Sequence, residues 1–169
     1  FTGRKDMYAN INGSIHADGV GTKPENLIRV LELKLYKSQI FGIDIEKFEI
    51  ASDVRGGIAQ LKKFEGQTSA GNFNCEGFYK LLDESYHLET RFREINIADA
   101  IGDTSLQSSI NLSIVYDGKG LNPKTSKSVL HINSDSSKIM GRELENLSVR
   151  GSQNGSRVYI DGISVKTPL

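Results

Sequence analysis

The stretch TKPENLIRVLELKLYKSQ (residues 22–39) decides the fold class that the sequence predicts. Its start has the features of a helix N-terminus. Thr22 and Glu25 have the spacing of a capping box, in which each side chain accepts a hydrogen bond from the backbone N–H of the other residue. Pro24 suits the first turn, where its missing N–H would have no partner in any case. The residues before Leu27 therefore predict that a helix begins here.

Apolar residues then recur at spacing four, as they do along one face of an amphipathic helix. The stripe consists of Leu27, Leu31 and Leu35, widened by Ile28 and Val30. Charged side chains fall between these positions and would face water. The spacing predicts one long helix that ends near Gln39.

Elsewhere apolar and polar residues alternate, which is typical of strands with one buried face. We expect strands over residues 7–16, 58–64, 73–81, 106–116 and 129–132, and a C-terminal hairpin over 147–165. Asn154-Gly155 would supply a type I′ turn for that hairpin. Residues 40–50 fit either a strand or a helix, 66–71 predict a loop, and 137–145 predict a short helix. The sequence thus predicts an α+β fold, with an antiparallel sheet packed against one long and one short helix.

Length and charge limit the possible functions. The 169 residues predict a single globular domain over 1–169, the core of a longer chain whose N-terminal tail would precede Phe1. Lys plus Arg and Asp plus Glu both number 21, so the formal net charge is zero. This balance argues against a strongly basic nucleic-acid binder and permits self-association. The one cysteine, Cys75, excludes an intrachain disulfide.

A search for reactive groups favours binding over catalysis. The loop Gly19–Lys23 precedes the predicted helix and could hold a phosphate at the helix N-terminus. Its Gly-Thr-Lys order differs from that of phosphate-binding loops, so a turn is favoured, and a small nucleotide-binding enzyme stays open as an alternative. Cys75 lies in an alternating strand, which predicts a buried, unreactive thiol. The histidines have no metal-ligand spacing; they are His16, His87 and His131. We expect no enzyme activity, cofactor or metal site.

Basic residues gather at two places that could contact a partner. Lys62 and Lys63 are adjacent, and Arg91 and Arg93 flank Phe92. In an extended chain both arginines would share one face, where they could meet phosphate groups or an acidic protein. These five residues are the candidate partner-binding site. The alternative is an amphipathic strand with a solvated side.

Four segments resemble the matrix proteins of rhabdoviruses. They are Asn74-Cys75-Glu76-Gly77, Thr90–Ile97, Ser109–Asp117 and Arg157–Ser164, and the similar regions span about residues 72–117 and 144–165. Their order and spacing are similar to those of the family. The short polar loop at 66–71 departs from members that carry a longer loop with an apolar tip, and would suit a diverged, plant-infecting branch.

The resemblance implies a virion structural protein. Such a protein would self-associate beneath the envelope, condense the viral nucleocapsid and link it to the membrane and the envelope glycoprotein tail during budding. It would occur in the virion, in the host cytoplasm and at the inner membrane surface, with no small-molecule substrate. The composition also permits a phage or pilus subunit.

Overall fold

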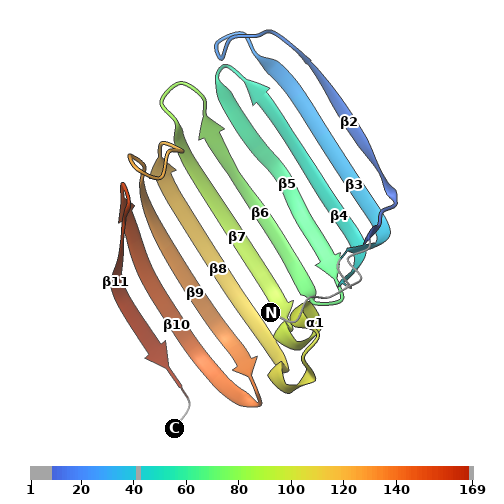
Figure 1. Cartoon of the computed structure of the whole chain (residues 1–169), viewed down its shortest axis with the longest axis vertical. Coiled ribbons are helices and arrows are strands. Elements are labelled where there is room, and N and C mark those ends of the chain that lie inside the picture. Colours follow the sequence, from blue (N-terminus) through green and yellow to red (C-terminus); the bar gives the residue numbers. More distant parts are fainter. Residues whose placement is uncertain (1–8, 41–42, 168–169) are drawn as a thin grey trace.

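The computed structural model describes residues 9–40 and 43–167. Eleven antiparallel strands form one sheet, and each strand from β3 onward lies beside the next along the chain (Figure 1). Strands β1 and β2 both pair with the outer side of β3. The strands are β1 Ala9–Asn10, β2 Gly13–Val20, β3 Ile28–Ile40, β4 Ile43–Arg55, β5 Ile58–Thr68, β6 Gly71–Lys80, β7 Ser85–Ile95, β8 Ser108–Lys119, β9 Lys127–Ile139, β10 Arg142–Asn154 and β11 Arg157–Lys166. A short helix α1, Ile97–Ile101, and a 3-10 turn, Thr104–Leu106, join β7 to β8.

The predicted long helix is wrong, because its residues form the strand β3. Spacing four is common to a helix and to a strand, whose side chains repeat every second residue. Leu31, Leu33 and Leu35 lie opposite Ser52, Ile50 and Phe48 of β4, on one face of the sheet. A helix would have set Leu33 apart from the other two. Pairing with β2 and β4 on both sides therefore overrides the capping signals.

The predicted short helix at 137–145 is also wrong. Strand β9 runs to Ile139 and β10 begins at Arg142, so Met140 and Gly141 form a two-residue hairpin turn. Both turn residues have positive φ, 49° and 79°, as a type I′ turn requires. Since neither predicted helix is present, the predicted α+β fold is wrong, and the described residues are almost entirely β.

Alternation located most strands correctly. The strands expected at 58–64, 129–132 and 157–165 are confirmed as parts of β5, β9 and β11. Those expected at 73–81 and 106–116 are confirmed as β6 and β8 except at their ends, since residue 81 lies in a turn and residues 106 and 107 precede β8. The terminal hairpin is confirmed, but its two-residue turn is Gly155-Ser156, one position later than predicted. The predicted loop at 66–71 is shorter, because β5 continues to Thr68 and β6 starts at Gly71. The first expected strand is present as β1 and β2; its residues 7 and 8 lie outside the described residues.

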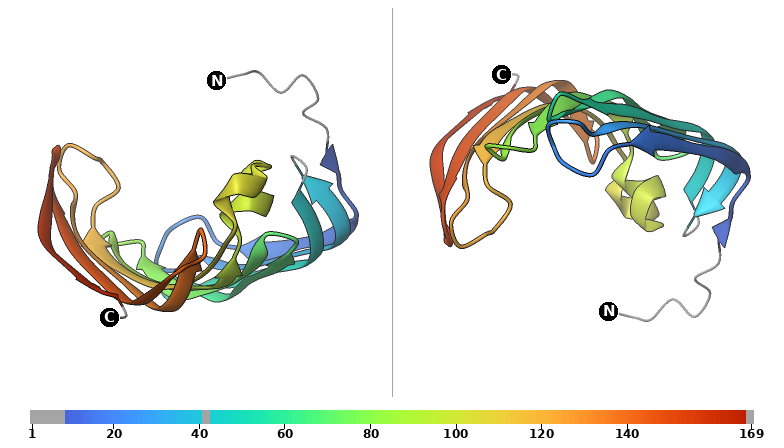
Figure 2. Two further views of the ribbon diagram at one scale, coloured as in Figure 1. Left: turned by 90° about the horizontal axis from the view of Figure 1, so that it is seen from below. Right: turned by 90° about the horizontal axis from the view of Figure 1, so that it is seen from above.

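Bulges held by serines accompany a strong curvature of the sheet (Figure 2). Lys37 in β3 and Ser136 in β9 both have φ of 45°, and a buried serine follows each of them. The Ser38 hydroxyl accepts the Asn12 N–H at 2.9 Å, and the Ser137 hydroxyl accepts that of Asn111 at 2.9 Å. Each hydroxyl takes the place of a ladder carbonyl where the register breaks, so the N–H groups of Asn12 and Asn111 keep an acceptor at the bulge.

Helix α1 lies on the concave side of the curved sheet (Figure 2). The Asn96 side chain caps its start by accepting the Ala98 N–H at 3.2 Å, and it also accepts the Ser108 N–H at 3.0 Å. Gly102, with φ of 74°, ends the helix in the left-handed conformation. These contacts fix the crossing from β7 to β8 at one end of the sheet.

We predict that Gly66→Val destabilises the protein. A Cβ at Gly66 would collide with the ring of Phe73, its cross-strand partner in β6. Displacing a packed aromatic ring typically costs about 1–3 kcal/mol. Urea unfolding should show this loss, whereas Gln67→Val, the adjacent exposed position on the other face, should change the unfolding free energy little. Equal effects of the two substitutions would contradict the packing described here.

Candidate functional site

One face of the sheet is apolar across almost its whole width. From β8 to β11 the pairs are apolar: Ile114 lies opposite Ile132, and Val149 lies between Ile132 and Ile163. Residues next to them along each strand point to the opposite face and are mostly polar or charged. We call the first side the apolar face. Its further members include Leu33, Ile50, Phe64, Phe73, Leu88, Phe92, Leu112, Tyr116, Leu130 and Leu147.

The apolar face is the concave side of the sheet. In Figure 2 the loop between β8 and β9 rises on the concave side, as α1 does. Leu121 and Pro123 of this loop line a cavity together with Leu61 and Leu88 of the apolar face. The loop is held there by Gln153, whose amide donates to the Pro123 carbonyl at 3.4 Å. The curvature therefore turns the apolar residues inward and forms a trough.

The described residues leave much of this trough uncovered. Only three apolar residues among them are buried, namely Ala70, Cys75 and Ala98. Toward the sheet edges, Ile15 and Ile160 are each 71% exposed. Contiguous exposed apolar surface is uncommon on soluble monomers and marks a site for a ligand or partner. The trough is therefore the candidate functional site.

Aromatic rings line the middle of the trough. Phe48, Phe64, Phe73 and Phe92 follow one another across four strands, with ring centroids 5.5 Å, 5.5 Å and 6.3 Å apart. These spacings are favourable for aromatic pairs. The row gives the trough a firm floor, because aromatic rings have few rotatable bonds.

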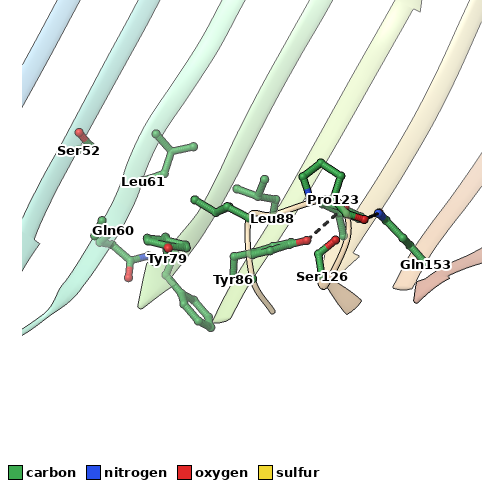
Figure 3. A pocket seen from close by; sticks show the side chains of 14 residues that line it. Ser52, Gln60, Leu61, Tyr79, Tyr86, Leu88, Pro123, Ser126 and Gln153 are labelled. Atoms are coloured by element: carbon green, nitrogen blue, oxygen red, sulfur yellow. Dashed lines mark hydrogen bonds between the residues drawn. The ribbon is translucent and has the colours of Figure 1, made fainter. Parts of the chain in front are cut away.

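A cavity of about 560 Å³ occupies one end of the trough, under the β8–β9 loop. Figure 3 shows Pro123, Ser126 and Gln153 on one side, Ser52, Gln60 and Leu61 on the opposite side, and Tyr86 and Leu88 between them. Its size falls in the range of about 300–1,000 Å³ that is usual for small-molecule sites. The lining is apolar and aromatic with a few neutral polar groups.

Two tyrosines provide the central polar group of the cavity. The Tyr86 hydroxyl donates to the Tyr116 hydroxyl at 3.2 Å, and their ring centroids are 5.2 Å apart. Burial, reinforced by the hydrogen bond with Tyr116, raises the pKa of Tyr86 to about 12. Gly118 makes room for the Tyr86 ring, since a Cβ there would collide with it. The alternation over 106–116 predicts the strand that carries Tyr116 but not its pairing with Tyr86.

The predicted partner-binding residues do not form one group. Phe92 belongs to the apolar face, whereas Arg91 and Arg93 are on the polar, convex face. Lys62 and Lys63 sit at a bulge in β5, and strand β6 separates them from β7. The basic residues therefore share a face but are divided by Asn72, Asn74 and Glu76 of β6.

Acidic neighbours neutralise most of these cations. Lys62 pairs with Asp53 of β4, and Arg91 pairs with Glu89. Lys63 contacts Glu49, and its Nζ lies 3.2 Å from an Oε1 of Glu65. The hydrogen bond from Lys63 is the main reason that the pKa of Glu49 is lowered, and the same bond raises the pKa of Lys63. These pairs, across β4 and β5 and along β7, leave little net positive charge here for an anionic partner.

The remaining sequence candidates lie apart from one another. The loop Gly19–Lys23 leads through a turn into β3, so the helix N-terminus that a phosphate would need is missing. Cys75 is buried in the trough, as predicted, while His87 lies on the polar face, where its Nδ1 is 2.7 Å from an Oδ1 of Asp117. Within the described ranges, no cluster of His, Cys, Asp or Glu could hold a metal ion. Among the residues that the structure describes, no helix is long and apolar enough to cross a membrane.

We predict that Tyr86 ionises at a higher pH than a free phenol does, in an alkaline titration followed by tyrosine absorbance. Unfolded tyrosine has a pKa near 10. Since folding raises the pKa of Tyr86 to about 12, the protein should lose stability as pH rises from about 10 to 12, and Tyr86 contributes to that loss. Tyr86→Phe should remove one late-titrating phenol, and urea should abolish the late step in the native sequence. A titration with no late step would contradict the buried tyrosine pair.

No family model, curated protein or solved structure matches the chain.

Proposed function

We propose that this chain binds the acyl chains of lipids in its concave trough, and that it acts by binding rather than by catalysis. The observation that carries the proposal is the register of the sheet, which places aliphatic and aromatic residues opposite one another on the concave side. Polar residues cover the convex side. A long, flexible apolar chain suits such a surface, because it can follow the curvature and displace water along its length.

The energetics favour a ligand of this kind. Each methylene removed from water contributes about 0.8 kcal/mol, so a chain of ten buried methylenes gains roughly 8 kcal/mol before the costs of association. A cavity of about 560 Å³ beside the open trough would hold part of such a chain. The charged pairs of the convex face keep that side in water, so a ligand is directed to the trough.

Neighbouring residues of β8 provide a matched test. Ile114 points into the trough between Thr90 and Ile132, while Val115 points to the convex face between Glu89 and His131. We expect Ile114→Asp to weaken binding of a fluorescent fatty acid at least tenfold, because the carboxylate would lose its hydration beside the ligand. Val115→Asp should leave the affinity within about twofold.

Fluorescence titration measures the affinity, and circular dichroism verifies that both variants keep the sheet. If neither variant nor the native sequence binds the fatty acid, the lipid proposal fails. If folded Ile114→Asp and Val115→Asp bind equally well, the trough is not the binding surface.

Self-association is the second candidate, and it is the property that the resemblance to rhabdovirus matrix proteins predicts. Strand β11 favours it: among the described strands it pairs only with β10, and it exposes 61% of Ile163 and 56% of Val165. An exposed edge strand can pair with another copy. Because the formal net charge is zero, electrostatic repulsion between copies would oppose such contact only weakly. The nucleocapsid, membrane and glycoprotein partners, and the location in the virion, stay predictions from the resemblance alone.

Sedimentation velocity over a range of concentrations tests the second candidate. Species larger than the monomer should grow with concentration at low salt. Ile163→Lys should suppress them by placing charge on the apolar side of β11, whereas Ser164→Lys, on its polar side, should have a smaller effect. A monomer at every concentration would count against self-association and leave the lipid proposal untouched.

A further inference from the structure

The cavity under the β8–β9 loop is neutral. None of the described residues that line it carries a charge, although a quarter of all residues in the chain are charged. The polar groups that reach it are the hydroxyls of tyrosine and serine and the amides of glutamine. A cavity for a carboxylate or phosphate would need a cation or several convergent N–H groups, since a buried charge without a partner costs several kcal/mol.

The tyrosine pair leaves one donor for a ligand. Tyr86 uses its hydroxyl hydrogen on the Tyr116 oxygen. Among the described residues no acceptor is found for the hydroxyl hydrogen of Tyr116, which also lines the cavity. The Tyr116 hydroxyl, polarised by the bond from Tyr86, is a good donor to a carbonyl oxygen.

The loop on the other side of the cavity adds neutral groups. Ser126 is buried, and Figure 3 places it beside Tyr86 at the rim formed by Pro123 and Gln153. Gly155 of the β10–β11 turn donates to the Ser126 carbonyl at 2.7 Å, which fixes this part of the loop. The hydroxyls of Tyr86 and Ser126 lie together near the loop, while Leu61 on the opposite side has Ser52 and Gln60 beside it.

We propose that this cavity selects the uncharged, oxygen-bearing segment of a lipid, namely an acyl ester, whose carbonyl accepts a hydrogen bond from Tyr116. The inference rests on the proposed binding of acyl chains in the trough and specifies their chemical class. Esterified chains would bind more tightly than free fatty acids of the same length. A charged headgroup, where the ester has one, would stay outside the cavity.

Three ligands with matched twelve-carbon chains test the proposal: methyl laurate, laurate and dodecane. Each is delivered from a cyclodextrin complex of known stability, and displaces an apolar fluorescent dye from the intact chain at neutral pH. We expect methyl laurate to bind about tenfold more tightly than laurate, because the carboxylate finds no cation. It should bind about fivefold more tightly than dodecane, as one neutral hydrogen bond allows.

Tyr116→Phe separates the hydrogen bond from the shape of the cavity. It should reduce the affinity for methyl laurate about fivefold, to that of dodecane, and leave dodecane binding unchanged. Tyr159→Phe, on the convex side of β11, is the control and should change neither. Unchanged dodecane binding also verifies that the variant is folded.

The outcomes distinguish the two proposals. If laurate binds as tightly as methyl laurate, or if Tyr116→Phe weakens ester and alkane equally, the ester selectivity is wrong while the trough remains a lipid site. If no ligand displaces the dye and the fluorescent fatty acid also fails to bind, the proposed function itself is wrong.

Discussion

A sheet with one apolar face must cover that face, and the described part of this chain supplies almost nothing to cover it. Stable domains usually stack a second layer on such a surface. Among the described residues, α1 and the β8–β9 loop lie over parts of the concave side (Figure 2). Most apolar residues are therefore half-buried by their neighbours in the sheet, and those of the edge strands are largely exposed. The proposed ligand follows from this shortage of cover.

Lipid binding and self-association are two ways of satisfying the same constraint. An acyl chain would cover the trough from inside, and a second copy would cover the exposed apolar residues of the edge strand β11. On the convex face, Lys62 and Lys63 are already paired with the cross-strand carboxylates Asp53 and Glu49, and neither proposal places its contacts there. The cavity beside Tyr86 and Tyr116 favours the first possibility, since its neutral polar groups suit a small oxygen-bearing group better than a protein surface.

The strands were predictable wherever apolar residues alternate strictly, as in 106–116, because alternation follows directly from the geometry of a strand. The stretch 22–39 was misread because Leu27, Leu31 and Leu35 satisfy both periods, and its capping residues favour a helix locally. Leu33, placed between Ile15 and Ile50, carries the information that distinguishes the two. The tyrosine pair could not be predicted, since Tyr86 and Tyr116 are thirty residues apart and meet only through the register of β7 with β8.

The sequence by itself determined which residues alternate and that the charges balance to zero; these are properties of covalent order and composition. The tertiary structure alone decided that residues 22–39 are a strand, which face of each strand is concave, and which side chains meet in the cavity. The reason is physical: strand pairing depends on partners distant in the chain, and the bulge serines Ser38 and Ser137 accept hydrogen bonds from the backbone N–H groups of Asn12 and Asn111, each 26 residues away.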